Sequence, residues 1–321
     1  MDAIVLAGGF GTRLRPWTDS LPKPLVPLLD TTLIEHSIRI LPRSIVNRVI
    51  IAAGYGVEQM RSHFANLDVG VDVLIVEEKE PLGTGGAIAN CMGDVRGNRF
   101  LVLNGDLITT VDIPGMAAQH ERDRRIVTIS LWPVENPSRF GVADFNTKDR
   151  AIKRFQEKPS PGEEYSNLIN AGCYLMEREV VDQMPEGPHS IEREVFPLIA
   201  ESGNMGGYRY SGRFIDAGTP TSYLEAMHAA IEDGAFNLGE VVGTSWSMGD
   251  IDDSSVIISS AIGNGCIIGR STVVSSSAVL EGANIGSNCH IEGCLIGRNA
   301  VIGDNVRMAN QVVAFNQRND A

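Results

Sequence analysis

The residues best suited to chemistry lie near the N-terminus, where a glycine-rich segment is followed at fixed spacing by two cations. Residues 8–11 (GGFG) directly follow an apolar stretch, 3–7, that predicts a short buried strand. Because glycine adopts positive φ without strain, the N–H groups of such a loop can turn toward one anion. Arg13 can bind phosphate oxygens through its forked guanidinium, and Lys23 adds a point charge between two prolines. The pattern predicts a site for polyphosphate.

Two better-known glycine loops do not fit this segment. A dinucleotide-binding fingerprint needs glycine where the chain has Leu14, and a Walker A loop needs Gly-Lys-Ser/Thr directly after the glycines. The stretch instead matches GGxGTRLxPxTxxxPKP at every defined position, and in this it resembles the sugar-1-phosphate nucleotidylyltransferases. The resemblance covers about the first 230 residues. It implies that the phosphate of a sugar 1-phosphate attacks a nucleoside triphosphate and that pyrophosphate leaves.

Two aspartates resemble the magnesium ligands of that family. Asp106 follows the apolar stretch LVLNG, and Asp216 stands in FIDAGTP, ahead of a turn and a helix. Without the resemblance, each aspartate could equally well be a turn residue or a helix cap as a metal ligand. The resemblance implies that they hold Mg²⁺, which neutralises charge between two anionic substrates. It thereby gives a catalytic set of Arg13, Lys23, Asp106, Lys158 and Asp216, in which Arg13 and Lys23 stabilise the triphosphate and the leaving pyrophosphate.

Three short segments resemble the sugar site of the family. Glu157 and Lys158 in EKP match a glutamate that binds sugar hydroxyls and a lysine that binds the sugar phosphate. Gly141 in RFGVADF, and Asn170 with Gly172 in NAGCY, resemble the parts that close around the sugar ring. Without the resemblance, Glu157 and Lys158 would be interpreted as a solvated surface pair. Gly141 would be interpreted as a strand glycine and Asn170 as a turn amide.

The segment EEKEPLGTGG bears on the nucleobase. Related pyrimidine enzymes commonly have glutamine five residues before the glycine that matches Gly83, whereas this chain has Glu78 there. An ionised carboxylate only accepts hydrogen bonds, which suits the ring N–H and exocyclic amine of guanine. Glu78 also fits a simple rim position in an acidic cluster. The residues assigned to the nucleotide are Leu6, Gly8, Gly9, Gly11, Thr12, Arg13, Glu78, Gly83 and Thr84.

The sequence favours mannose 1-phosphate as the sugar substrate but leaves alternatives open. PLGTGGAI and SIEREVFP resemble guanylyltransferases that act on mannose 1-phosphate or on a heptose 1-phosphate. Many mannose enzymes have tryptophan before the second aspartate, where this chain has Phe214, a form closer to the heptose type. Glucose-1-phosphate uridylyl or thymidylyl transfer is a further alternative. A catalytically silent paralogue that binds nucleotide sugar is another, although the intact cations and aspartates argue against it.

Composition limits the other partners. The chain has 321 residues, 43% hydrophobic and 21% charged, with a net charge of −13, so no broad basic surface is available for nucleic acid or an anionic membrane. No apolar run approaches the roughly 18 residues of a membrane span, and no signal region is evident, which favours the cytoplasm. Five cysteines form no CxxC pair, so neither disulfides nor zinc are expected.

Apolar strands alternate with helical patterns up to residue 105, which predicts βαβ crossovers. With the resemblance, this gives an α/β, Rossmann-like nucleotidyltransferase domain with a mixed sheet. Ligands are then expected at the carboxyl ends of the strands. Strands are predicted at 3–7, 49–53, 71–76, 100–104, 126–132, 142–145, 152–156 and 171–176, and helices at 33–41, 57–64, 84–91, 191–201 and 221–231.

Beyond residue 254 the pattern changes to a six-residue repeat. An aliphatic residue recurs with a small residue two positions before it, and two single-residue shortenings break the phase. This predicts a short left-handed parallel β-helix of about three coils, at roughly 18 residues per coil, with glycine at the corners. The aliphatic positions are Ile262, Ile268, Val274, Leu280, Ile285, Ile291, Ile296 and Ile302; the small ones are Ser260, Cys266, Thr272, Ala278, Ala283, Cys289, Cys294 and Ala300; the corner glycines are Gly263, Gly269, Gly286, Gly297 and Gly303.

The predicted domains are a catalytic domain at 1–233, a linker at 234–254, the β-helix at 255–310 and a tail at 311–321. Because the ends of so short a coil expose apolar surface, we expect it to pack on the catalytic domain or to form a homo-oligomer. An acyltransferase role for the β-helix is a lesser alternative. The predicted β-helix has a single histidine, His290. Its small number of coils leaves little length for a coenzyme A groove.

Overall fold

The computed structural model describes residues 1–320, and the chain folds into two compact units. The first comprises residues 1–9 and 37–214, and the second comprises residues 10–36 together with the chain from residue 215 onward. This division differs from the predicted linear order of domains, because the segment that carries Arg13 and Lys23 belongs with the C-terminal part. No helix in the described part of the chain is long and apolar enough to cross a membrane.

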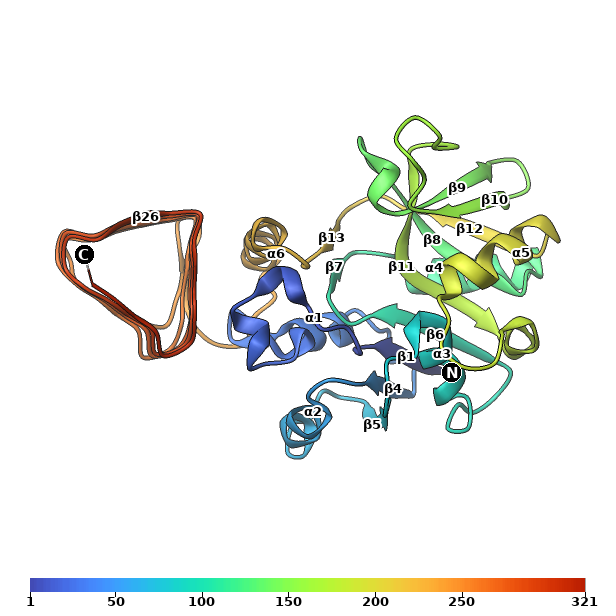
Figure 1. The fold of residues 1–321 in the computed structure, drawn as a ribbon, viewed down its shortest axis with the longest axis horizontal. Helices are drawn as coiled ribbons and strands as arrows, with labels where there is room; N and C mark the ends of the chain where they lie inside the picture. The colour runs from blue at the N-terminus through green and yellow to red at the C-terminus, as the bar shows by residue number, and fades with distance from the viewer. Residues whose placement is uncertain (321) are drawn as a thin grey trace. The chain divides into compact units, whose positions relative to one another are not determined.

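The first unit is built on a nine-stranded mixed sheet of order β5-β4-β1-β6-β11-β8-β12-β10-β9 (Figure 1). β1 pairs in parallel with β4 and β6, whereas β11 pairs antiparallel with β6 and β8. The mixed sheet that we predicted is therefore confirmed. The strands are β1 (Asp2–Leu6), β4 (Arg48–Ala53), β5 (Asp72–Glu77), β6 (Arg99–Asn104), β8 (Val127–Pro133), β9 (Gly141–Asn146), β10 (Ala151–Glu157), β11 (Leu168–Glu177) and β12 (Met205–Arg209).

An apolar core joins one face of this sheet to two helices of the first unit. That core joins Ile4, Ile50 and Val102 of the central strands to Ile88 of α3 and Phe196 of α5. Central parallel strands are covered on both faces, which is why they read as continuous apolar runs. The helices and turns are α1 (Leu33–Arg39), which begins in the second unit, α2 (Val57–Phe64), α3 (Gly83–Cys91), α4 (Ile113–Asp123), η4 (Pro137–Arg139), η5 (Arg178–Gln183), η6 (Ile191–Val195) and α5 (Phe196–Glu201), with a short strand β7 (Leu107–Thr109).

The second unit begins with an irregular segment, residues 10–26, which we call the signature loop. Its only regular pieces are three 3₁₀ turns, although Leu14, Trp17 and Val26 are fully buried. A hairpin, a short strand and α6 follow, and a capping box between Thr219 and Ser222 starts α6. These elements are η1 (Thr12–Leu14), η2 (Trp17–Asp19), η3 (Lys23–Leu25), β2 (Pro27–Leu28), β3 (Thr31–Thr32), β13 (Phe214–Asp216) and α6 (Pro220–Glu232).

The second unit ends in stacked parallel strands from residue 245 to residue 319, which we call the C-terminal coil. They form three parallel sheets that follow one another around a triangular coil, an arrangement consistent with a β-helix (Figure 1). β14 (Glu240–Val242) adds an antiparallel edge. The three stacks are β15 (Ser245–Ser247), β18 (Ala261–Ile262), β21 (Ala278–Val279), β24 (Leu295–Ile296) and β27 (Val312–Val313); β16 (Asp250–Ile251), β19 (Ile267–Ile268), β22 (Asn284–Ile285), β25 (Val301–Ile302) and β28 (Arg318–Asn319); and β17 (Val256–Ile258), β20 (Val273–Ser275), β23 (His290–Glu292) and β26 (Arg307–Ala309).

Strand pairing corrects the predicted limits and spacing of the coil. β15 and β16 pair into the stacks inside the segment 234–254 that we predicted as a linker, and β27 and β28 do so inside the predicted tail. From β16 onward the coil advances by 17 residues rather than about 18, as for the hydrogen-bonded pair Ser260 and Ser277, whereas β15 and β18 pair 15 residues apart. Each of these 17-residue coils therefore has one side that is a residue shorter than the other two.

The same pairing corrects one step of the repeat. Val279, not Leu280, pairs with Ile296 and joins the interior of the coil. The small residue of that step is correspondingly Ser277 rather than Ala278. Adjacent apolar residues concealed the shift, since Val279 and Leu280 are both buried.

The predicted corner glycines have a different role from the expected one. Positive φ occurs at other residues, among them Ser271 and Asn288, and at none of the five predicted glycines. Those glycines instead permit close stacking of coils: a Cβ at Gly269 would lie 2.7 Å from the carbonyl carbon of Gly286.

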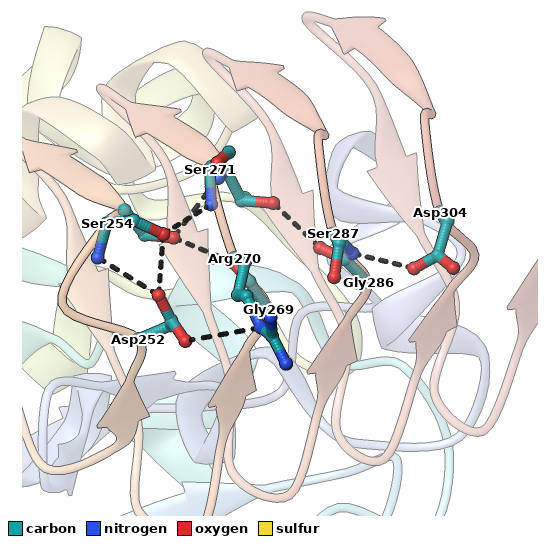
Figure 2. Close-up of polar contacts among 10 residues, drawn as sticks. Asp252, Ser254, Gly269, Arg270, Ser271, Gly286, Ser287 and Asp304 are labelled. Atoms are coloured by element: carbon teal, nitrogen blue, oxygen red, sulfur yellow. Dashed lines mark hydrogen bonds and ion pairs between the residues drawn. The ribbon is translucent and has the colours of Figure 1, made fainter.

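Side chains bridge successive coils along one corner, as Figure 2 shows. Ser254 Oγ donates to Asp252 at 2.6 Å and accepts from Ser271 N at 2.9 Å. Farther along, Asp304 accepts from Ser287 N at 2.7 Å. These bonds tie neighbouring coils together along this corner.

Candidate active site

The two cations of the signature loop meet the second predicted aspartate around Gly218. A Cβ at Gly218 would lie 2.7 Å from Arg13 Nη2 and 3.1 Å from Lys23 Nζ. It would also lie 2.8 Å from Asp216 Oδ1, and Lys23 Nζ is 3.5 Å from that oxygen. Only glycine leaves this space open. The buried Lys23 and the exposed Arg13 thus place two positive charges beside one carboxylate, as a polyphosphate–metal site requires.

The local fold of the loop brings these cations together. Gly11 has φ +62°, and a Cβ there would lie 2.7 Å from Lys23 Cβ, so the loop folds back on itself at this residue. Thr18 Oγ1 donates to Gly11 O at 2.8 Å and closes the turn. Thr12, the first residue of η1, is exposed beside it.

In the first unit, the end of β1 lies next to the predicted nucleobase residue. Leu6 is opposite Ala52 of β4 and Asn104 of β6. Gly8 follows, and a Cβ on it would lie 2.7 Å from Glu78 Oε1. Gly9 is exposed, with open space around its Cα. Glu78 and the glycine turn therefore share one edge of the sheet.

Glu78 is half-buried, and this position has an electrostatic consequence. Burial raises the pKa of its carboxyl above the ordinary value, and a hydrogen bond from Leu82 N opposes that shift. A carboxylate that has lost part of its water gains more from hydrogen-bond donors on a ligand than an exposed one does. The residue thus differs from Glu77 next to it, which is exposed and paired with Arg61 at 3.0 Å.

Asp106 follows β6 on a turn at the same strand-end edge. Gly105 N donates to Leu6 O at 3.0 Å, and a Cβ at Gly105 would lie 3.0 Å from that oxygen, so glycine lets the turn approach β1 closely. Asp106 itself is half-buried. Leu6, Glu78 and Asp106 lie at or directly after the carboxyl ends of β1, β5 and β6, the edge at which α/β sheets commonly bind ligands.

The start of α3 is fixed against a distant segment. Gly83 has φ +71°, and a Cβ there would lie 2.5 Å from His189 O. Thr84 Oγ1 accepts from Ile191 N at 3.0 Å and donates to Glu192. These contacts hold the PLGTGG turn against the SIEREVFP segment.

The predicted sugar residues on β9 and β10 face one another. Glu157 is opposite Gly141, and a Cβ at Gly141 would lie 2.8 Å from Glu157 Oε2. Lys158 Nζ lies 3.0 Å from Glu157 Oε1. Lys158 is largely exposed and has φ +50°, a conformation that is uncommon for lysine. Glycine at 141 gives the carboxylate room, and the lysine projects beside it.

The other predicted sugar residues lie on a β-bulge in β11. The register of β11 shifts between Asn170 and Tyr174, and Gly172 within it has φ +67°. Gly172 N donates to Asn170 Oδ1 at 3.0 Å, and a Cβ at Gly172 would lie 2.7 Å from Asn104 Nδ2. Bulges re-aim side chains near functional sites. Here Gly172 lies against Asn104, at the end of the strand that precedes Asp106, and Asn170 is hydrogen-bonded to Gly172.

The structure adds Tyr174 and Glu192 to the candidate site. Asn170 Nδ2 donates to Tyr174 OH at 2.8 Å, and that hydroxyl donates to Glu192 Oε1 at 3.3 Å. Burial raises the pKa of Tyr174, which keeps its hydroxyl protonated. Since Thr84 donates to Glu192, the network joins a predicted nucleotide residue to a predicted sugar residue. Sequence analysis singled out SIEREVFP but gave Glu192 no role.

Each of the two predicted metal ligands is a carboxylate, which suits a hard cation such as magnesium. Among residues 1–320, no group of three or more His, Cys, Asp or Glu side chains is arranged to bind a metal. Asp106 and Asp216 offer one carboxylate each, and magnesium is commonly held by one or two carboxylates with substrate phosphates. Cysteine chemistry is an unsuitable alternative, because the five thiols are free and buried, and burial raises the pKa of Cys91 and of Cys173 to about 12.

Residues 2–233 match the family model described as nucleotidyl transferase, and residues 246–317 match one described as GMPPB C-terminal domain. The chain is 32% identical over 305 residues to a mannose-1-phosphate guanylyltransferase of Mycobacterium tuberculosis, with 91% of this chain and 83% of the relative covered. It is 34% identical over 301 residues to a probable mannose-1-phosphate guanylyltransferase 2 of Arabidopsis thaliana, covering 91% and 81%. The crystal structure of HddC from Yersinia pseudotuberculosis complexed with GMP-PN has 28% identity and a TM-score of 0.61, covering 71% of this chain and 98% of that one.

The α/β fold, the glycine turn and the cation cluster define an enzyme that transfers a phosphate-bearing group. The chain belongs to the nucleotidyl transferase family, and the resemblance drawn from its signature is confirmed. Enzymes of this family generally use a divalent metal.

Proposed function

We propose that the chain transfers a guanylyl group from GTP to mannose 1-phosphate, giving GDP-mannose and pyrophosphate. Two relatives that span most of the chain carry the name mannose-1-phosphate guanylyltransferase. The observation that carries the proposal is the convergence of Arg13, Lys23 and Asp216 around Gly218. Fixed positive charge there would counter the repulsion between two phosphate-bearing substrates.

The reaction is a direct displacement at the α-phosphorus. An oxygen of the mannose 1-phosphate forms a bond to that phosphorus, and the bond to the bridging oxygen of the β-phosphate breaks. Pyrophosphate leaves with the electron pair. Arg13 and Lys23 stabilise the charge that develops on it, while Lys158 holds the attacking phosphate and Glu157 binds sugar hydroxyls. Orientation of the two substrates supplies much of the rate.

We assign the metal to Asp106 and Asp216 and identify it as Mg²⁺. When bound, it neutralises phosphate charge and withdraws electrons from the α-phosphorus. Lys23 beside Asp216 keeps that carboxylate oriented. The hard, oxygen-only donor set favours Mg²⁺ over softer metals.

Glu78 reads the nucleobase in this proposal. It accepts hydrogen bonds from the ring N–H and exocyclic amine of guanine, a pattern that uracil and thymine do not offer. The half-buried position of its carboxyl next to Gly8 supports this role. The remaining proposed nucleotide residues are Leu6, Gly8, Gly9, Gly11, Thr12, Arg13, Gly83 and Thr84.

Gly141, Asn170 and Gly172 complete the proposed sugar site. A heptose 1-phosphate is the second candidate for the sugar, because Phe214 stands where many mannose enzymes have tryptophan. Phe214 packs against Phe140 at a centroid distance of 6.2 Å, and Phe140 O accepts from Lys158 N at 3.0 Å. Phe214 thus contacts the residue whose carbonyl accepts a hydrogen bond from the sugar lysine.

A panel of nucleoside triphosphates against sugar 1-phosphates, scored by pyrophosphate release, tests the proposal. We expect the highest kcat/KM for GTP with mannose 1-phosphate. A higher value for GTP with a heptose 1-phosphate would replace mannose, and a preference for UTP or dTTP with glucose 1-phosphate would refute the guanylyl assignment. Binding of GDP-mannose without any pyrophosphate release would identify a silent paralogue.

Three further assignments accompany this function. The six-residue spacing and the three stacks of parallel strands favour the left-handed β-helix that the sequence predicts. The exposed ends of that coil favour a homo-oligomer. Five free cysteines fit a reducing compartment, and we therefore place the enzyme in the cytoplasm.

A further inference from the structure

Trp17 links the signature loop to the C-terminal coil. It stands at an undefined position of the signature, between Arg13 and Lys23, and its side chain is fully buried. Its Nε1 donates to Val313 O at 2.8 Å, although the two residues are 296 positions apart. Its ring stacks on Phe315 with a centroid distance of 5.8 Å and an interplanar angle of 28°. The contact joins the cation-bearing loop to β27.

A second contact supports the same loop from α6. Tyr223 is 1% exposed and packs edge-on against Trp17 with centroids 5.5 Å apart. Its hydroxyl donates to Pro27 O, directly after the loop. α6 and β27 thus hold the loop at its middle and at its end.

The loop needs this support because little regular structure fixes its shape. Three 3₁₀ turns do not provide the ladder of hydrogen bonds that holds a strand in register. The coil, in contrast, is a stack of paired strands bridged by side chains. A displacement of about 1 Å in a binding group can cost about 10²-fold in rate.

We propose that Trp17 is a positioning residue through which the C-terminal coil holds Arg13 and Lys23 in place for the pyrophosphate moiety of the nucleotide. The coil is then part of the phosphate-binding machinery and not only an appended module. The inference rests on the proposed function in one respect: it requires that polyphosphate binds at these two cations.

Inorganic pyrophosphate is the probe, because its binding depends on neither the base nor the sugar. The variant is Trp17→Phe, which keeps a buried ring and removes the Nε1 donor. Val313 O still accepts from Gly297 N at 3.0 Å, so the coil keeps its own bond. The matched control is Trp246→Phe in β15, because Trp246 is 1% exposed and its Nε1 donates to Leu238 O at 2.9 Å.

We expect Trp17→Phe to weaken pyrophosphate affinity about tenfold, as measured by calorimetry on the full chain with Mg²⁺, a change of about 1.4 kcal/mol. Trp246→Phe should stay within about twofold of the parent protein, and both variants should lose similar thermal stability. Unchanged pyrophosphate affinity in Trp17→Phe, with lowered stability, would show that Trp17 is a packing residue and would overturn the inference.

Two more variants complete the experiment. Phe315→Ala removes the stacking partner at a half-buried position and should weaken pyrophosphate binding in the same direction; if Trp17→Phe does not fold, unchanged affinity in Phe315→Ala overturns the inference. Lys23→Ala should abolish most pyrophosphate binding. If Lys23→Ala binds normally, the cation assignment fails and this inference fails with it. Failure of the proposed substrate pair would appear separately, in the panel of triphosphates and sugar phosphates.

Discussion

The two units hold their functional side chains in different ways. In the first, Glu157 lies opposite Gly141 in a paired sheet, and Asn170 lies on a bulge of β11, so strand register sets their positions. In the second, Arg13 and Lys23 lie on an irregular loop that a distant coil and α6 support. Residues at strand ends are placed by their own sheet, whereas residues on the loop depend on a support that lies elsewhere in the chain.

The largest effect should come from the strand-end aspartate of the first unit. Asp106→Ala removes one proposed metal ligand, and turnover should fall at least roughly 10²-fold, as for loss of one transition-state contact. Turnover is measured as the rate of pyrophosphate release. Asp112→Ala is the control: this exposed aspartate caps α4 through Gly115 N at 3.0 Å, so its loss should cost about 1 kcal/mol of stability and leave turnover unchanged. Normal metal-dependent turnover in Asp106→Ala would remove Asp106 from the mechanism.

A smaller effect is expected at the sugar phosphate. Lys158→Ala deletes a charge-assisted contact of about 2 kcal/mol, so the KM for mannose 1-phosphate should rise about 30-fold. The KM for GTP should change little, and stability should stay the same because the side chain is 57% exposed. Lys153→Ala, at an exposed lysine of the strand that Lys158 directly follows, is the matched control. An equal rise in both KM values would deny the lysine a selective role at the sugar site.

Exchange of the nucleobase residue should alter selectivity rather than rate. Glu78→Gln replaces a pure acceptor with a group that also donates, and the preference for GTP over UTP should fall about tenfold. Kinetics with the two triphosphates give the ratio. Glu77→Gln, at the exposed neighbouring position, should keep the parent preference. If both variants retain it, guanine is recognised by other residues.

The smallest effect is a dependence on pH. Because burial raises the pKa of Glu78, its ionised form is lost at a higher pH than that of an ordinary glutamate, and the KM for GTP should begin to rise there as pH falls. The stability that the neutral carboxyl contributes is present below its unfolded pKa and is lost as pH rises through the folded pKa. Glu78→Gln should therefore remove the pH dependence of GTP binding and should raise thermal stability more at neutral than at acid pH. A parallel pH profile in variant and parent would contradict this.

Much of the fold could be predicted from patterns within single segments. Features that depend on contacts between distant segments could not. Helix α2 has the predicted bounds, Val57–Phe64, because its apolar period lies within the segment. Helix α4 was not predicted, since Pro114 and Gly115 at its start obscure a helical pattern. The predicted register of the repeat was wrong by one residue at Val279 and Leu280 because both are apolar. Only the pairing of Val279 with Ile296 shows which of the two takes the repeat position.

The residues of the candidate site also fall into two groups: those that a local sequence pattern predicts and those that only the folded structure reveals. The signature and the EKP and NAGCY segments are local patterns, so their residues could be chosen from sequence. Trp17 and Glu192 act through partners far along the chain: Trp17 and Val313 are 296 positions apart, and Thr84 and Glu192 are 108 positions apart. No spacing rule within one sequence reveals such contacts, because only the folded sheet and coil bring the partners together.

The proposal that Asp106 and Asp216 bind one metal ion is tested most directly by a double-variant cycle on turnover. Asp106→Ala, Asp216→Ala and the double variant are compared by pyrophosphate release from GTP and mannose 1-phosphate. If both carboxylates bind the same metal, each single variant loses at least roughly 10²-fold and the double variant loses little more. Losses that multiply, to roughly 10⁴-fold in the double variant, would show that the two aspartates act independently and would contradict the account.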